Sequence, residues 1–342
     1  MTADKVGGLT DITISIVNTS NRDLLLECLR SLTQDDDHRS SFEIVVLDNA
    51  SDDDSVAAVK HSFPEVTVIE QPYRAGFGAN HNRVVRETDS RYIYVLNEDT
   101  ISSPGSIDRM IEYLDRSPRV AMLGPRIVGG DGRQQPSAWR LMSLPVCAAW
   151  AFTIGQVGVV QSKGYRPKAV GAVSACAMIL RREPFEEIGM FDERFFIYCE
   201  EADTACRLAV RGYEAHYFPP VEVIHLGQQS TSGSPVRLVN ENWRSLNMYL
   251  SKYHSRTAAR IMRILLGVGY LGAGIAASVV RALPRGLQPS AARSWSAPTY
   301  FLQATTAFRG PRGEGIREAA EHWNVKHGRS SPLQIRPSGD AA

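Results

Sequence analysis

RYIYVLNEDT, residues 91–100, places a strand directly before a cluster of polar and acidic side chains. Tyr92 to Leu96 is a short run of aromatic and β-branched residues, which is typical of a buried strand. Asn97, Glu98 and Asp99 follow at once, at the carboxyl end of a strand, where open α/β sheets bind their ligands. Neighbouring carboxylates repel each other unless a cation or a donor-rich ligand lies between them. An acidic turn that only caps the next helix is the alternative interpretation.

The residues before this stretch alternate between strand and helix patterns. Apolar runs at Ile12–Val17, Phe42–Leu47 and Val66–Ile69 predict three further strands. Helical spacing follows each of them, and Ser103-Pro104 predicts the start of another helix that continues to about Ser117. Four strand–helix units in succession predict a doubly wound α/β sheet.

Polar residues follow three of these strands: Asn18, Asp48 and the run from Asn97 to Asp99. They predict one crevice along the carboxyl edge of the sheet. The loop containing Gly76 and Gly78 follows the third strand and is not a G-x-G-x-x-G fingerprint, and no Walker-type phosphate loop is present. A nucleotide that binds in this crevice is therefore not held by either phosphate loop.

Three carboxylates, Glu200, Glu201 and Asp203, open a predicted helix that continues to about Arg211. Complementing the helix dipole is a sufficient structural reason for acidic side chains there, although three exceed what capping needs. Glu200 and Asp203 share one face, whereas Glu201 points about 100° away. One carboxylate can thus serve chemistry while basic neighbours hold the others. His225 ends a later apolar strand, where either a structural role or a ligand role is open.

Composition and charge bound the class of protein. The 342 residues contain five cysteines without a C-x-x-C pair, which favours a reducing compartment and excludes a thiolate metal site. No signal peptide pattern is expected at the N-terminus, because Asp4, Lys5 and Asp11 interrupt it. We therefore expect a cytoplasmic protein. Residues 237–342 carry 15 Lys and Arg against 5 Asp and Glu, whereas the rest of the chain is acidic.

The chain resembles inverting glycosyltransferases of family 2, and in particular bacterial rhamnosyltransferase-like members that extend lipid-linked glycans. The resemblance runs from about Ile12 to His225. It rests on VLDNASDD, GFGANHN, LNEDT, GPRIVGGDGRQQPS and MILRREPFEEIGMFDERFFIYCEEAD, in that order. It implies a GT-A fold with a mostly parallel sheet in residues 1–235. It also implies a nucleotide-diphosphate sugar donor and a divalent metal ion.

The resemblance assigns donor contacts to several polar residues. Asp48 would bind the pyrimidine base, and Asn18 together with Asn80 or Asn82 would line the donor pocket. Asn97 stands at the first position of the family's D-x-D motif, where the family has Asp. This neutral side chain would contact the ribose or the metal.

The resemblance also assigns the metal ligands and the catalytic base. Asp99 would be the main ligand of Mg²⁺ or Mn²⁺, and His225 would be a further ligand. Glu201 falls on the catalytic base, which is normally Asp in the family's E-D pair. Because the extra methylene changes its reach, Asp203 remains the second candidate.

The implied reaction is transfer of a sugar, rhamnose from dTDP-rhamnose, to a lipid-linked or cell-wall glycan. Two alternatives stay open. A non-catalytic glycan- or nucleotide-binding module at the membrane would explain the departures at Asn97 and Glu201. A nucleotidyltransferase would have a similar sheet, but it would carry a basic, glycine-rich phosphate loop after the first strand, which Val17 to Ser20 does not form.

Residues 236–330 are predicted to form a basic helical region that associates with the membrane, followed by a disordered tail at 331–342. Ile264–Val280 has no charge and is flanked by arginines, including Arg281 and Arg285. A membrane span needs about twenty residues, so an interfacial or re-entrant helix, a packed helix and a true span all remain open. We expect peripheral binding to the anionic inner face of the cell membrane. Nucleic acid is not expected as a partner, because the basic residues lack interleaved aromatics.

Overall fold

A computed structural model describes residues 10–34, 39–153, 158–161, 164–227, 234–284, 288 and 296–330 of the chain. Two predictions fall outside these residues: the disordered tail at 331–342 and the flanking position of Arg285.

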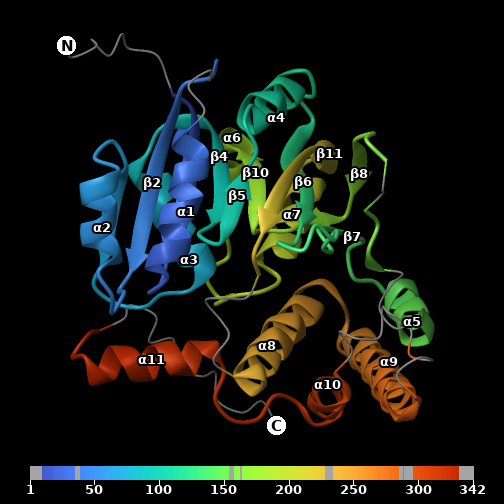
Figure 1. The fold of residues 1–342 in the computed structure, drawn as a ribbon. Coiled ribbons are helices and arrows are strands. Elements are labelled where there is room, and N and C mark those ends of the chain that lie inside the picture. The colour runs from blue at the N-terminus through green and yellow to red at the C-terminus, as the bar shows by residue number, and fades with distance from the viewer. Residues whose placement is uncertain are drawn as a thin grey trace, which may run out of the picture.

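One large mixed sheet forms the centre of the molecule (Figure 1). The strands are β1 (Thr10–Asn18), β2 (Phe42–Asn49), β3 (Thr67–Gln71), β4 (Ser90–Asn97), β5 (Thr100–Ser102), β6 (Val120–Val128), β7 (Ala138–Trp139), β8 (Lys168–Val170), β9 (Ala172–Val173), β10 (Ala177–Arg181) and β11 (Glu214–His225). The large sheet has the order β3-β2-β1-β4-β10-β6-β11-β5, and β8 also pairs with β11. The four strands predicted from the N-terminal half are neighbours and all run parallel.

Helices cover both faces of this sheet. The helices of the described chain are α1 (Arg22–Thr33), α2 (Ser55–Ser62), α3 (Phe77–Glu87), α4 (Ser106–Asp115), α5 (Leu144–Thr153), α6 (Arg182–Glu187), α7 (Glu200–Val210), α8 (Pro235–Tyr253), α9 (Arg256–Ala282), α10 (Ala297–Arg309) and α11 (Ile316–Lys326). Helices α1, α2 and α4 bury apolar side chains in a core on one face, and α3, α6 and α7 do so in a core on the other. The prediction of a doubly wound, mostly parallel sheet is confirmed.

The segment after Asp99 differs from its prediction. Thr100–Ser102 forms the edge strand β5, which pairs with β11 through His225 opposite Thr100. The next helix therefore begins at Ser106 and not at Pro104, and it follows Gly105, which has a left-handed φ of 65°. Pairing of β5 with a strand more than a hundred residues later is a tertiary effect that the local sequence does not carry.

The apolar runs at Val170–Leu180, Ala215–Phe218 and Val221–His225 also predict strands, and the structure differs from these predictions in extent. The predicted strand Val170–Leu180 is divided among β8, β9 and β10. The two short strands expected before His225 form the single strand β11, whose register shifts between Phe218 and Glu222. Pro219 and Pro220 lie at this shift. Because proline has no backbone N–H to donate, it interrupts the ladder without ending the strand.

The C-terminal helices lie against the part of the chain that forms the sheet. Helices α8, α9 and α10 share a hydrophobic core with Phe195 and Cys199. Phe195 precedes α7, and Cys199 is the N-cap residue of α7. Trp243 and Tyr249 of α8 are buried there. Figure 1 shows α8 and α11 along the edge of the sheet at which β1 and β2 end. The division into units at 1–235 and 236–330 stays a prediction.

Candidate active site

The sheet register brings the predicted crevice residues together. Asn18 is opposite Asp48 at the ends of β1 and β2, and Val17 is opposite Asn97 at the end of β4. Parallel strands whose carboxyl ends meet at one edge leave a crevice there. The polar residues that the sequence places after three strands therefore share one edge of the sheet.

The carboxylate of Asp48 is held in a fixed orientation. Ser51 donates its backbone N–H to Oδ2 at 3.0 Å and its hydroxyl to Oδ1 at 2.5 Å. Asn18 donates its side-chain amide to Oδ1 at 3.3 Å and to the Ser51 hydroxyl at 3.1 Å. Three short polar side chains thus form a preorganised acceptor at the end of β2.

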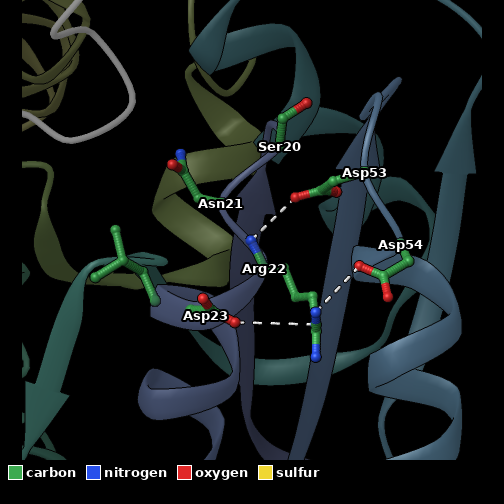
Figure 2. A pocket seen from close by; sticks show the side chains of 7 residues that line it. Ser20, Asn21, Arg22, Asp23, Asp53 and Asp54 are labelled. Carbon is green, nitrogen blue, oxygen red and sulfur yellow. Dashed lines mark hydrogen bonds and ion pairs between the residues drawn. The ribbon is translucent and has the colours of Figure 1, made fainter.

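A pocket opens beside this group, where β1 leads into α1 (Figure 2). It is lined by Ser20, Asn21, Arg22, Asp23, Leu24, Asp53 and Asp54. The guanidinium of Arg22 faces Asp54 at 3.5 Å and Asp23 at 3.9 Å, and its backbone N–H donates to Asp53. The charges of this pocket are therefore paired with one another, and none of the predicted site residues lines it.

Asn80 and Asn82 have contacts within the protein. Both are buried on α3. The Asn80 side chain accepts a hydrogen bond from Gln71 and donates to the Ala75 carbonyl. Asn82 bonds to both the N–H and the carbonyl of Phe191. These contacts give both amides structural roles, and direct contact with a donor stays a prediction for them.

Asn97 and Glu98 differ in their surroundings. The Asn97 backbone N–H donates to the Cys176 carbonyl at 2.9 Å, and its side chain is half-buried. Glu98 is buried and accepts a hydrogen bond from the Asn21 side chain at 2.9 Å. Glu98 therefore ties the end of β4 to the loop after β1.

Asp99 and His225 come together at the edge of the sheet. Asp99 is 3% exposed, and its Oδ1 lies 3.3 Å from His225 Nε2. Gln135 fixes the ring of this histidine: its amide nitrogen donates to the His225 carbonyl, and its amide oxygen faces Nδ1, each at 2.9 Å. The Gln135 oxygen can only accept, so Nδ1 carries the proton in the neutral ring. The Nε2 lone pair then faces a carboxylate oxygen.

Two facing acceptors fit a bound cation. Asp99 Oδ1 has no hydrogen-bond partner among the residues that the structure describes, which is unusual for a buried carboxylate. An imidazole oriented through its other nitrogen is the usual arrangement of a metal-binding histidine. Within the described residues no group of three or more His, Cys, Asp or Glu converges as a complete metal site. The protein thus offers a two-ligand pair that fits a divalent cation also bound to a ligand's oxygens.

Asp203 and Glu201 occupy different environments on α7. Asp203 is fully buried and accepts hydrogen bonds from Arg207 Nε and the Tyr253 hydroxyl, both at 2.7 Å. Lys252 also pairs with it at 2.5 Å. Both of its carboxylate oxygens accept from these donors. Glu201 is half-buried, and loss of hydration raises the pKa of its carboxyl to about 7.

Glu200 does not have the basic neighbours that the sequence predicted for it. It is 3% exposed, and no basic side chain among the described residues pairs with it. Its Oε2 lacks a hydrogen-bond partner within the same residues. Burial, followed by the charge of Glu201, raises its pKa well above the usual range. The prediction of basic neighbours is correct for Asp203 and wrong for Glu200.

Cys176 lies beside the end of β4. Its backbone carbonyl accepts from Asn97 at the end of β4. Burial raises the pKa of the Cys176 thiol to about 12, and the charges of both Asp99 and Glu201 add to this shift.

The sequence did not indicate three residues that hold side chains of the site: Gln135, Lys252 and Tyr253. Gln135 lies within the quoted segment GPRIVGGDGRQQPS, so its polar pair of glutamines was an available signal. Lys252 and Tyr253 lie on α8, about fifty residues after the carboxylate they bind. No local pattern distinguishes them from other residues at the end of an amphipathic helix.

The match to a family model assigns the chain to the enzymes that transfer sugars. Residues 12–189 match the model of glycosyl transferase family 2, and the chain belongs to that family. The prediction from the sequence motifs is thereby confirmed.

Relatives in the family include rhamnosyltransferases. The chain is 29% identical over 235 residues to N-acetylglucosaminyl-diphospho-decaprenol L-rhamnosyltransferase of Mycobacterium tuberculosis, covering 62% of this chain and 75% of that protein. It is 24% identical over 250 residues to rhamnosyltransferase WbbL of Escherichia coli, covering 70% and 92% of the two chains.

Solved structures confirm the GT-A type of fold. The mannosyltransferase PcManGT from Pyrobaculum calidifontis, in complex with GDP-Man and Mn²⁺, superposes with a TM-score of 0.54 at 17% identity, covering 93% of this chain and 84% of that one. S. aureus TarS 1-349, in complex with UDP-GlcNAc, gives 0.51 at 12% identity, covering 88% and 92%. At these identities the likeness concerns the fold alone.

Proposed function

We propose that this protein is an inverting, metal-dependent rhamnosyltransferase that uses dTDP-rhamnose and a polyprenyl-linked glycan acceptor. The names of both relatives above support the sugar, and the name of the Mycobacterium tuberculosis relative supports the class of acceptor. The observation that carries the metal-dependent reaction is the pair of facing acceptors, Asp99 Oδ1 and His225 Nε2, 3.3 Å apart at the crevice.

The donor would lie along the ends of β1, β2 and β4. Asp48, which Ser51 and Asn18 hold in place, would accept a hydrogen bond from the N–H of a pyrimidine base. Asn97 is half-buried at the end of β4 and would meet the ribose. Asn80 and Asn82 stabilise the loop between β3 and α3 and the segment at Phe191, through their hydrogen bonds to Ala75 and Phe191.

Asp99 and His225 would hold Mg²⁺ or Mn²⁺ together with the donor's diphosphate oxygens. Carboxylate and diphosphate oxygens suit both ions, and one imidazole favours Mn²⁺ somewhat. The ion, when bound, neutralises negative charge on the departing nucleoside diphosphate. Gln135 keeps the His225 ring in the tautomer that presents Nε2 toward Asp99.

Glu201 would be the catalytic base that takes the proton from the acceptor hydroxyl. A general base works best when its pKa is near the working pH, and burial raises that of Glu201 to about 7. Asp203, the second candidate, faces Arg207, Lys252 and Tyr253. Two of these donors are cations, and the carboxylate is fully buried, so Asp203 acts as the centre of a structural ion-pair cluster.

The reaction is tested with a panel of dTDP- and UDP-sugars, with Mg²⁺, Mn²⁺ or EDTA, and a polyprenyl-diphosphate-linked N-acetylglucosamine as acceptor. We expect transfer from dTDP-rhamnose that needs the metal and gives an inverted anomer, detected by mass spectrometry and NMR. Nucleotide binding without turnover of any sugar in the panel would support a non-catalytic module and contradict the proposal.

The α9 apolar stripe is the set of exposed apolar side chains on one face of α9. It consists of Ile261, Ile264, Val268, Leu271, Ile275 and Val279. The spacings of three and four residues align them on one side of the helix. By length and composition α9 is the one described helix that is able to cross a membrane, while a third of its most apolar window is buried in the protein.

We propose that the α9 apolar stripe lies in the interface of an anionic membrane, at its cytoplasmic face. The opposite face of α9 packs on α5 and α10 through Met262, Leu266 and Ala273, which favours an interfacial helix over a span. Arg256 and Arg260 lie exposed beside the start of the stripe, and Arg281 at its end. Each cation near an anionic leaflet contributes about 1 kcal/mol, so the charge and the apolar face act together.

Sedimentation with phosphatidylglycerol vesicles tests this docking. The double variant Ile264→Glu/Ile275→Glu is expected to lower the bound fraction at least severalfold, whereas Val325→Glu, an equally apolar and exposed site on α11, is expected to bind like the wild type. Unchanged binding of the stripe variant, or absence of vesicle binding by the wild type, would contradict the proposal. A stripe variant that only turns a dimer into a monomer would assign the stripe to a second copy.

A further inference from the structure

Helix α11 lies at the nucleotide end of the proposed donor crevice, although it follows the family-matched residues 12–189 by more than a hundred positions. In Figure 1 it runs below β2 and α3, along the edge where the parallel strands end. The sequence suggested only a basic, membrane-associating role for this part of the chain. Its contacts in the structure point to a different one.

Asn324 binds the backbone of the loop that precedes α3. Its side-chain oxygen accepts from the Arg74 N–H at 2.7 Å, and its amide nitrogen donates to the Arg74 carbonyl at 3.0 Å. The side chain is 2% exposed. An amide that bonds to both backbone groups of one residue fixes the position of that residue, because both bonds are shielded from water.

Trp323 completes the attachment through side chains. Its indole Nε1 donates to Asp52 Oδ2 at 3.0 Å, and Arg74 donates to the same oxygen at 2.7 Å. The Arg74 guanidinium carbon lies 4.2 Å from the centre of the Trp323 ring, within the range of a cation–π contact. One residue of α11 thus contacts the two loops that follow β2 and β3.

Those two loops contain or support the group that orients Asp48. Ser51, which donates twice to Asp48, directly precedes Asp52. Ala75, which follows Arg74, is bonded to the Asn49 side chain through its N–H at 2.8 Å and its carbonyl at 3.3 Å. The loops therefore form one hydrogen-bonded unit, and α11 holds that unit from outside.

The same helix reaches the other side of the crevice. Arg317 donates to the Arg194 carbonyl, and its guanidinium lies 5.7 Å from the centre of the Phe196 ring. The Phe196 carbonyl accepts from Phe77 at the start of α3. A side chain at Gly76 would come within 2.6 Å of that carbonyl, so the two segments approach too closely for any other residue. Helix α11 thus joins the Arg74 loop to the segment that leads into α7.

We infer that Asn324 and Trp323 are positioning residues for the nucleoside part of the donor, which makes α11 a required part of the donor site. The inference rests on the proposed function, because that proposal assigns Asp48 to the base of the nucleotide. Loss of either side chain frees the Asn49–Asp52 and Arg74–Ala75 loops to move. The loss therefore weakens donor binding more than it slows the chemical step.

Calorimetric binding of UDP and dTDP to the full-length protein tests this inference. Asn324→Ala removes both hydrogen bonds to the Arg74 backbone, so it is expected to raise the dissociation constant about threefold to tenfold. Trp323→Phe keeps the ring over Arg74 and loses only the bond to Asp52, so its effect is expected to be smaller than that of Trp323→Ala. Lys326→Ala, at an exposed position of the same helix, is the matched control and is expected to bind like the wild type.

Three further readouts separate positioning from stability. The donor KM is expected to rise with kcat nearly unchanged, while the melting temperature of Trp323→Phe stays close to that of the wild type. Wild-type dissociation constants in both Trp323→Phe and Trp323→Ala would overturn the inference. If the wild-type protein binds neither nucleotide, the proposed function itself is overturned, and the inference fails with it.

Discussion

Glu201→Gln is expected to lower turnover by two or more orders of magnitude and to leave donor affinity nearly unchanged. The substitution keeps the size of the side chain and removes its basicity, and loss of a general base typically costs about 10²–10⁴ in rate. Single-turnover transfer from saturating donor measures the rate, and calorimetry with dTDP measures the affinity. Because Glu201 would act on the acceptor side, nucleotide binding does not depend on its charge.

The same residue predicts a pH dependence. Only the ionised carboxylate can accept the acceptor's proton, and burial raises the pKa of Glu201 to about 7. The kcat of the wild type is therefore expected to rise as the pH passes upward through about 7 and to level off above it. In Glu201→Gln the residual rate is expected to lack this rise, which distinguishes loss of the base from loss of structure.

Asp203→Asn provides the matched comparison on the same helix. Removing this charge leaves the Lys252 ammonium and the Arg207 guanidinium without their shared carboxylate, so we expect a lower melting temperature. A loss of turnover in Asp203→Asn at an unchanged melting temperature, together with a nearly normal Glu201→Gln, would assign the base to Asp203.

The polar ends of the strands could be predicted from the sequence because they follow from local patterns and one topological rule. Buried runs ending at Val17, Leu47 and Leu96 predicted the strands, and parallel pairing brings their carboxyl ends to one edge. Asn18, Asp48 and Asn97 follow those ends directly. Their closeness therefore required no knowledge of distant contacts.

The partners of these residues could not be predicted in the same way. Gln135 orients His225 from a position 90 residues earlier, and Asn324 holds Arg74 from a position 250 residues later. Such pairs depend on how whole elements pack, and a single sequence carries no pattern for them. The same reason explains Glu200: helical geometry predicted which face it shares with Asp203, but not that no cation from the described part of the chain pairs with it there.

The asparagines of α3 show a limit of another kind. In the motif GFGANHN, Asn80 and Asn82 lie beside the predicted donor crevice, so the resemblance assigned them to the donor. Their side chains are buried and hydrogen-bonded to Ala75 and Phe191. A polar residue inside a motif can shape the loop that binds a ligand without touching the ligand, and the sequence alone does not separate the two cases.

Asp99→Ala is expected to abolish transfer and to remove the metal dependence of nucleotide binding. Asp99 supplies the only carboxylate of the proposed metal pair, and its Oδ1 faces the bare Nε2 of His225 at 3.3 Å. In the wild type, dTDP together with Mn²⁺ is expected to raise the melting temperature more than dTDP with EDTA, because a ligand that binds only the folded state stabilises it. In Asp99→Ala the two increases are expected to be equal.

The melting temperature without metal separates this effect from unfolding. Removing a buried carboxylate oxygen that lacks a hydrogen-bonded partner among the described residues leaves no new unpaired donor, so Asp99→Ala is expected to melt no lower than the wild type. Asp23→Asn, with a side chain 93% exposed, is the control.

His225→Ala is expected to reduce the same thermal shift. Because both side chains would hold one ion, adding His225→Ala to Asp99→Ala is expected to cause no further loss. Additive losses, or near-normal turnover in Asp99→Ala, would show that the two residues do not share a metal.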